Sequence, residues 1–237
     1  MTEPARRKAA DHRHRIALLV PSSNTVMEND LHRALPSAHY TIHTGRMYLV
    51  ATTREAEIAM IEDHAPRAAD DLGTARPDLL VFGCTSAGSL FGLDYDASVC
   101  RALGERAGCS ALGVISAASE AIAAHPVDRL AVITPYVEDL TQSVAKALAR
   151  EGMEIVRAEG MGISDNVALA DPTPEEIVAF CRAKLSDVRF DALFVSCTNF
   201  RSLEARARLE AEFGVPVITS NSAVIAAIRK RCESHAA

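Results

Sequence analysis

The feature that most constrains the fold of this 237-residue chain is an internal repeat of three short segments. Residues 16–24 resemble residues 130–138, residues 80–86 resemble residues 193–199, and residues 113–119 resemble residues 216–222. The offsets are 114, 113 and 103 residues, and the segments occur in the same order both times. Each segment joins an apolar run to polar residues, so the repeat predicts two similar halves, the second of which starts near Asp128.

Short apolar segments alternate along the chain with longer segments that carry apolar residues at helical spacing. The predicted strands are residues 16–20, 40–46, 79–83, 111–115, 130–134, 154–159, 192–196 and 215–219. The clearest predicted helices are residues 26–35, 55–72, 137–151 and 174–185. Thr53 and Thr173 stand at the start of two of them as capping residues. Apolar strands that alternate with helices predict a parallel sheet with helices on both faces.

These patterns predict an α/β protein made of two pseudo-symmetric, flavodoxin-like parallel-sheet halves, with the active site in the cleft between them. We assign residues 1–14 to a disordered tail, residues 15–127 to the N-terminal half and residues 128–237 to the C-terminal half. We expect the C-terminal helix to cross over to the N-terminal half.

The polar residues of the repeat fall at the carboxyl ends of the predicted strands, where ligands bind in open α/β sheets. They include Ser23 and Asn24, Cys84, Thr85 and Ser86, Tyr136, Cys197, Thr198 and Asn199, and Asn221. Two halves related by a pseudo-twofold axis would bring the two Cys-Thr turns face to face. Asn24, Asn166, Asn221 and Tyr136 are neutral donors that can hold a carboxylate beside a thiolate. Turn chemistry is the alternative for each asparagine, and Asn24 is also placed to cap a helix.

Cys84 and Cys197 are the candidate catalytic residues. A thiol needs only a modest depression of its pKa to yield a nucleophilic thiolate near neutral pH. Each of the two precedes a threonine and a polar stretch that is expected to open a helix, where free backbone N–H groups would favour the thiolate. A lone cysteine at a strand end is more often a small buried hydrophobe, but two at matched positions of a repeat favour function. The other four cysteines are assigned to packing.

Composition and motifs exclude several other classes of function. The net charge of −6 argues against nucleic acid as a partner, and no apolar run is long enough for a membrane span or a signal sequence. We therefore expect a cytoplasmic protein with free thiols. The cysteines form no CxxC pair, the histidines are scattered, and no GxGxxG or phosphate loop follows a strand. No metal and no cofactor are predicted.

The segment Val-Pro-Ser-Ser-Asn-Thr-Val-Met-Glu at residues 20–28 closely resembles the opening motif of the maleate cis-trans isomerases. These belong to the aspartate/glutamate racemase superfamily, together with the arylmalonate decarboxylases and hydantoin racemases. The resemblance runs from about Arg15 to about Lys230. It includes residues 45–47, 131–136, 165–168 and the Ser-Cys pair at residues 196–197.

The resemblance implies a cofactor-independent isomerase that converts maleate, or a close cis-enedioate, to fumarate. Cys84 matches the nucleophile and Cys197 the proton donor, while Asn24, Tyr136 and Asn166 match residues that bind the substrate carboxylates. The Cys84 thiolate would add to the alkene, the new single bond would rotate, and elimination would follow. The family also implies a dimer or larger homo-oligomer.

Other readings of the two thiols stay open at this point. The residues after Cys84 and Cys197 are more polar than in maleate isomerases, and the Cys-Thr-Ser turn resembles the racemase and decarboxylase branches. Two thiols on opposite faces of one carbon suit a racemase or epimerase that acts beside a carboxylate. Decarboxylases of this kind carry glycine at the first position, so Cys84 weighs against decarboxylation. A non-catalytic binding module would have had no need to keep both thiols and Asn24.

Overall fold

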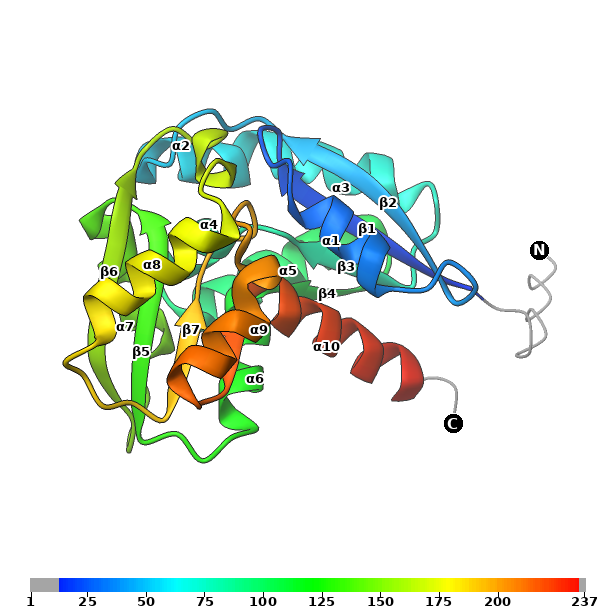
Figure 1. Ribbon diagram of the computed structural model, residues 1–237. Coiled ribbons are helices and arrows are strands. Elements are labelled where there is room, and N and C mark those ends of the chain that lie inside the picture. The colour runs from blue at the N-terminus through cyan, green and yellow to red at the C-terminus, as the bar shows by residue number, and fades with distance from the viewer. Residues whose placement is uncertain (1–12, 235–237) are drawn as a thin grey trace, which may run out of the picture.

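The computed structural model describes residues 13–234, apart from the side chain of Ser234. Eight strands form two four-stranded sheets, in which every neighbouring pair is parallel. The first sheet contains β1 (His14–Pro21), β2 (Tyr40–Met47), β3 (Leu79–Phe82) and β4 (Ser110–Gly113). The second contains β5 (Arg129–Tyr136), β6 (Glu154–Ile163), β7 (Ala192–Val195) and β8 (Val217–Thr219). Figure 1 shows the two sheets in separate parts of the molecule, each flanked by helices, so the predicted fold class is confirmed.

Helices connect the strands in both halves. The N-terminal half has α1 (Met27–Ala34), α2 (Arg54–Ala59), the π-helical turn η2 (Met60–His64), α3 (Ala65–Gly73), α4 (Thr85–Ser89), α5 (Leu93–Ala107) and α6 (Val114–Ala123). The C-terminal half has α7 (Glu138–Leu148), the 3-10 turn η3 (Ala168–Ala170), α8 (Pro174–Leu185), α9 (Ser202–Phe213) and α10 (Ser220–Ser234). The predicted cap at Thr173 forms a complete capping box with Glu176, and α8 has the predicted bounds.

The two sheets have the same strand order, β2-β1-β3-β4 and β6-β5-β7-β8. The central strands are buried along their length, as their uninterrupted apolar sequences predict. Ile16 pairs with Leu79 in the first sheet, and Leu130 pairs with Ala192 in the second. These positions are related by the offsets of 114 and 113 residues that the sequence repeat gives. Two of the three repeated segments therefore occupy equivalent places.

The third repeated segment is misaligned by the sequence comparison. Gly113 is the residue that pairs with Phe82, whereas Thr219 pairs with Val195, so the equivalent positions differ by 106 residues and not by 103. The predicted strand at residues 111–115 also extends too far at its carboxyl end. β4 stops at Gly113, and Val114 already begins α6, because a buried helix of alanine, valine and isoleucine has the same apolar composition as a buried strand.

The last helix of each half packs against the other half. α10 packs against α6 and α1, and α6 contacts β8 and α7. The Arg229 guanidinium donates to the Ala34 carbonyl oxygen across this contact, over a distance of 2.6 Å. Figure 1 shows α10 leaving the second sheet and running beside the elements of the first. The boundaries that we assigned to the halves stay predictions. Residues 1–12 of the predicted tail lie outside the described residues, and β1 already begins at His14.

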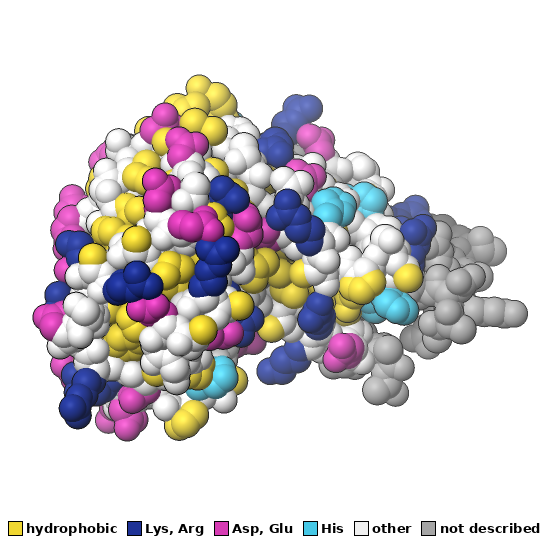
Figure 2. Space-filling model, in the orientation of Figure 1, with side chains coloured by type: hydrophobic (Ala, Val, Ile, Leu, Met, Phe, Trp, Pro, Cys, Tyr) yellow, Lys and Arg dark blue, Asp and Glu magenta, His cyan; other side chains and the backbone are white. Residues whose placement is uncertain are grey.

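Charged side chains of both signs are interspersed on the face that Figure 2 shows. Many form pairs on the helices of the second half, such as Arg182 with Glu212 at 2.6 Å and Arg201 with Glu204 at 2.9 Å. Exposed pairs of this kind contribute little to stability. None of the helices within residues 13–234 has the length and apolar character that a membrane crossing requires.

Candidate active site

The two Cys-Thr turns meet directly, as the repeat predicts. Both follow the carboxyl end of a central strand, β3 for Cys84 and β7 for Cys197. The Thr198 hydroxyl donates to the Gly83 carbonyl oxygen over 3.0 Å, and the hydroxyls of Thr85 and Ser220 lie 3.0 Å apart. Two halves that share no strand are thus joined at the point where both thiols lie.

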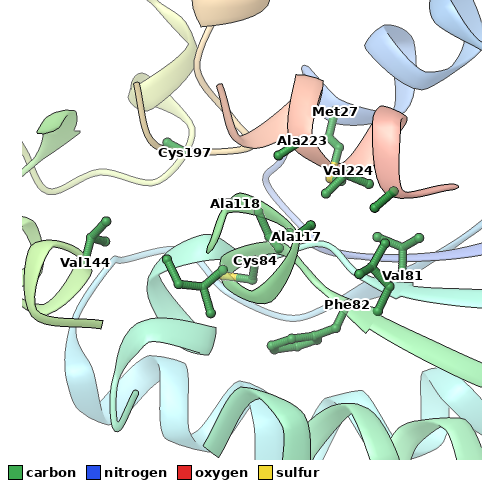
Figure 3. Packing of buried hydrophobic residues seen from close by; sticks show 14 of the residues in the cluster. Met27, Val81, Phe82, Cys84, Ala117, Ala118, Val144, Cys197, Ala223 and Val224 are labelled. Carbon is green, nitrogen blue, oxygen red and sulfur yellow. The ribbon is translucent and has the colours of Figure 1, made fainter. Parts of the chain in front are cut away.

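Cys84 is held by the turn from β3 into α4. Its side chain is buried, and Figure 3 shows it within the hydrophobic packing near Ala117 and Ala118 of α6. The preceding residue must be glycine, because a Cβ at Gly83 would lie 2.7 Å from the Leu19 carbonyl oxygen of β1. The Cys84 Sγ atom lies 3.7 Å from the Ser86 Oγ atom, in hydrogen-bonding geometry. The predicted helix opening after Cys84 is present, since α4 starts at Thr85.

Cys197 has an unusual backbone conformation, with a φ of +90° that residues with a side chain rarely adopt. Its N–H donates to the Ser220 hydroxyl over 3.0 Å, and the Asn199 N–H points at its sulfur over 3.3 Å. The Tyr136 hydroxyl also donates to the thiol. The first of these contacts holds the Cys197 backbone, and the other two hold its sulfur. The helix expected directly after Cys197 is absent, because the chain makes a turn and α9 starts only at Ser202.

The two thiols have pKa values opposite to those predicted. Backbone N–H groups do contact both sulfurs and lower the pKa, as expected. Burial outweighs them: it raises the pKa of Cys84 well above that of a free thiol and raises the pKa of Cys197 to about 12. Both residues therefore carry their proton in this state, and the Cys84 thiol needs a base to become a nucleophile.

Glu57 is a buried carboxylate that the sequence analysis missed. It lies on α2, is fully buried, and accepts a short hydrogen bond from the Ser86 hydroxyl through its Oε1 atom. Its Oε2 atom is buried and has no hydrogen-bond partner among the described residues. Burial raises the pKa of Glu57 to about 7, and the Ser86 hydrogen bond opposes the shift. Its charge also raises the pKa values of Cys84, Cys197 and Tyr136, so these four groups form one electrostatic cluster.

A sequence signal for Glu57 does exist. Glu57 shares the buried face of its helix with Met60, Ile61 and Ala65, and Leu72 continues that face. A carboxylate on the apolar stripe of an amphipathic helix is costly unless it is paired or functional. The π-helical turn η2, a form frequently found at functional sites, follows directly.

The predicted amides form a network that spans both halves. The Asn24 side-chain nitrogen donates to the Thr198 hydroxyl over 3.0 Å. Its side-chain Oδ1 atom accepts the N–H groups of Val26 and Met27 at the start of α1. Asn24 is thus a bridge between halves as well as a cap. Asn166 donates to the Ser23 hydroxyl over 2.6 Å, and the Ser23 hydroxyl in turn donates to the Leu49 carbonyl oxygen.

The side chains of Asn199 and Asn221 form hydrogen bonds within the protein. Asn199 donates to the Asn166 carbonyl oxygen over 2.6 Å and accepts the Thr25 N–H over 2.8 Å. Asn221 donates to the buried carboxylate of Asp30 over 2.8 Å and to the Thr198 carbonyl oxygen. These bonds hold the turn around Cys197 in place.

The remaining cysteines lie apart from this cluster and are free thiols. Cys100, Cys181 and Cys232 are buried and Cys109 is half-buried, as the packing assignment predicts. Within residues 13–234 no group of three or more His, Cys, Asp and Glu side chains is arranged to hold a metal ion.

The comparisons with known proteins identify the family of the chain. The family model for arylmalonate decarboxylase matches residues 16–236. A maleate isomerase of Pseudomonas putida is 32% identical over 231 residues, which are 92% of this chain and 91% of that protein. A crystal structure of a Pseudomonas putida maleate isomerase with maleate has a TM-score of 0.82 and 28% identity, covering 90% of this chain and 89% of the other.

A third similar structure is a mutant of the Nocardia farcinica maleate cis-trans isomerase with a covalently bound succinylcysteine intermediate. It has a TM-score of 0.82 and 26% identity, and the match covers 92% of each chain. These matches confirm the resemblance that the motif at residues 20–28 predicts, and they indicate an isomerase as the class of enzyme. The chain belongs to the arylmalonate decarboxylase family of the Asp/Glu racemase superfamily, which it shares with the maleate isomerases.

Proposed function

We propose that the protein isomerises maleate, or a close cis-enedioate, to the trans isomer without a cofactor. The observation that carries the proposal is the meeting of Cys84 and Cys197 at the ends of two equivalent strands, inside a shell of neutral hydrogen-bond donors. A mutant of a similar maleate isomerase holds a succinylcysteine, which is the adduct that a cysteine forms with maleate.

In the first step the Cys84 thiol loses its proton to a base in the site, and its sulfur forms a bond to one alkene carbon. The π bond breaks, and its electron pair moves to the neighbouring carbon, where the adjacent carboxylate delocalises it. The Cys197 thiol is protonated at neutral pH, because burial raises its pKa to about 12, so it can donate a proton to that carbon. The product is a succinyl thioether on Cys84.

In the second step the former double bond is single and can rotate. Cys197 then takes back the proton from the carbon, the electron pair re-forms the double bond, and the Cys84 sulfur leaves. Covalent addition removes the barrier to rotation, which is the purpose of the nucleophile. Each cysteine ends in its starting state.

The two substrate carboxylates require donors that do not neutralise the nucleophile. We assign this role to the side-chain amides of Asn24 and Asn166 and to the hydroxyl of Tyr136, which are all buried close to the cysteines. The single proton of the Tyr136 hydroxyl points at Cys197 in this structure and turns to the substrate carboxylate on binding. Hydroxyls of Ser23, Thr85 and Thr198 line the same network. Neutral donors that are already fixed by hydrogen bonds can stabilise an anion without reorganising.

Proton NMR of the purified protein with maleate in D2O tests this proposal. We expect fumarate to form with the wild type and not with a Cys84→Ala variant. A Cys197→Ser variant should slow turnover and accumulate a succinyl adduct on Cys84, detectable by mass spectrometry of the intact protein. Circular dichroism of the three proteins controls for folding.

The absence of fumarate from folded wild-type protein would exclude maleate as the substrate. Deuterium exchange at the α-carbon of chiral carboxylic acids would then test for a racemase that uses the same two thiols, and CO2 release from disubstituted malonates would test for a decarboxylase.

A further inference from the structure

The proposed reaction leaves one chemical problem unsolved, because the Cys84 thiol must lose a proton inside a buried site. Its pKa lies well above that of a free thiol owing to burial, so bulk water does not supply the thiolate near neutral pH. A group that receives the proton at the moment of addition is required. Glu57 is the buried carboxylate nearest to this role, and the mechanism above does not use it.

The hydrogen bonds between Cys84, Ser86 and Glu57 have a defined direction when Glu57 is ionised. In that state the Ser86 hydroxyl donates its single proton to the Glu57 carboxylate. Its oxygen can therefore only accept from Cys84, whose Sγ atom lies 3.7 Å away. The thiol proton thus points at Ser86 and the Ser86 proton points at Glu57. A shift of both protons along this chain moves one proton from sulfur to carboxylate.

The surroundings of Glu57 favour its neutral form. The residue is fully buried, and its Oε2 atom has no hydrogen-bond partner within residues 13–234. The groups that interact with it electrostatically are Cys84 beside α4, Cys197 after β7 and Tyr136 at the end of β5, and each ionises to an anion. The ionisable residues of its own helix and of η2, which packs against it, are exposed: Arg54, Glu55, Glu62, Asp63 and His64.

We propose that Glu57 accepts the proton of Cys84 through the Ser86 hydroxyl. Because it acts through another residue, Glu57 is a positioning residue, and this role rests on the reaction proposed above for this site. When the sulfur adds to the alkene, the S–H bond breaks and its proton goes to the Ser86 oxygen, while the Ser86 proton goes to Glu57. The electron pair of the S–H bond forms the C–S bond. Elimination returns both protons along the same path.

This transfer conserves the charge of the pocket. Before addition the negative charge lies on Glu57, and after addition and protonation of the carbon it lies on the Cys197 sulfur, while Glu57 is a neutral acid. The negative charge thus moves from one buried group to another during the reaction and does not accumulate.

The pH profile of Cys84 alkylation tests the proposal without any substrate. The full-length protein is treated with iodoacetamide between pH 5 and 9, and the rate of labelling at Cys84 is followed by peptide mass spectrometry. In the wild type we expect a rate that rises with pH, bends near the Glu57 pKa of about 7 and levels off above it, as Glu57 becomes fully ionised. In Glu57→Gln we expect a rate about a hundredfold lower at pH 7, which continues to rise about tenfold per pH unit.

Two further variants separate the loss of the proton path from the loss of any negative charge on α2. Ser86→Ala interrupts the path and should reproduce the loss seen in Glu57→Gln. Glu55→Gln removes an exposed carboxylate from the same helix and should behave as the wild type. Melting temperatures verify that each variant is folded. If Glu57→Gln reacted as fast as the wild type with the same profile, or faster, Glu57 would be only a structural or repelling charge.

The result is distinguishable from a failure of the proposed function. A protein that does not convert maleate but shows the levelled profile would retain the proton path and need another substrate. A protein that converts maleate with the same pH profile of kcat/KM in the wild type and in Glu57→Gln would keep the function and lose this inference.

Discussion

At the scale of single residues, Asn24 both caps α1 and joins the two halves, and its position in the sequence is compatible with either role. Its side-chain Oδ1 atom accepts two N–H groups at the start of α1, and its side-chain Nδ2 atom donates across the halves to Thr198. A helix cap needs only an acceptor, whereas the proposed contact with a substrate carboxylate needs a donor. The two tasks can therefore be tested by two substitutions.

We predict that Asn24→Asp keeps the cap but costs about 1–3 kcal/mol in the free energy of unfolding, because it loses the hydrogen bond to Thr198 and buries a charge. It should also raise KM for maleate at least about tenfold. The aspartate still accepts the N–H groups of Val26 and Met27, but it cannot donate and it repels a dicarboxylate. Asn24→Ala should lose the cap as well, at a cost of about 1–2 kcal/mol in the free energy of unfolding. Urea denaturation and steady-state kinetics measure the two effects. An unchanged KM in Asn24→Asp would leave Asn24 with the role of a cap alone.

The φ of +90° at Cys197 leads to a second prediction at this scale. Cys197→Gly should be more stable than Cys197→Ala by about 1 kcal/mol, because glycine adopts this conformation without strain. Both variants should lack isomerase activity, since neither has a proton donor at this position. Thermal unfolding of the pair measures the difference. Equal melting temperatures would mean that the backbone relaxes when the thiol is absent.

At the scale of helices and strands, the sequence predicts most of the elements because continuous apolar strands alternate with helices that have clear apolar spacing and capping residues. The central strands are apolar throughout, and α8 starts at a capping residue followed by proline. The prediction is wrong where one apolar run contains the end of a strand and the start of a helix, as at Gly113 and Val114. The sequence shows Glu57 as a carboxylate on an apolar helix face, but it does not show that its partner is Ser86, which lies 29 residues away.

The strand end at Gly113 depends on a buried carboxylate. Asp96 of α5 accepts the N–H and the hydroxyl of Ser116 in the first turn of α6, and so caps that helix. A Cβ at Gly113 would lie 2.0 Å from its Oδ2 atom, and one at Gly88 would lie 2.5 Å from its Oδ1 atom. Two glycines thus make the space that the Asp96 side chain fills between α4, α5 and α6.

We predict that Gly113→Ala destabilises the protein by about 3 kcal/mol, because Asp96 is fully buried and cannot move aside. The same substitution in an Asp96→Ala background should cost much less, since the carboxylate that it strikes is gone. A double-mutant cycle with urea denaturation measures this coupling. Additive effects of the two substitutions would show that the clash at Gly113 is with the backbone.

At the scale of the whole molecule, the two halves are joined by buried polar bonds and by the exchange of their last helices. Asn24 with Thr198, Asn166 with Ser23 and Asn221 with Asp30 all cross from one half to the other. The repeat in the sequence predicts that the halves face each other, and it predicts which residues lie at the contact. It does not predict how the amides pair, because side-chain hydrogen bonds depend on the rotation between the halves.

Buried acids make the stability of the whole molecule depend on pH. Burial raises the pKa of Glu57 to about 7 and that of Asp96 to about 6, and it also raises the pKa of Asp30. A carboxyl group with a raised pKa in the folded state stabilises the fold fully below its unfolded pKa. That stabilisation is lost as the pH rises through the folded value. The exposed carboxylates with lowered pKa values, such as Glu212, act only below this window.

We therefore predict that the free energy of unfolding falls between pH 5 and pH 8. Over this range Glu57 accounts for a loss of about 3 kcal/mol and Asp96 for about 1 kcal/mol, at 1.36 kcal/mol per pKa unit. Glu57→Gln should remove most of the fall and should be more stable than the wild type at pH 8, because it buries no charge. Urea denaturation of both proteins at several pH values in this range provides the measurement. A wild-type stability that stays constant or rises over this range would mean that water reaches Glu57 and Asp96 and keeps both pKa values near those of exposed acids.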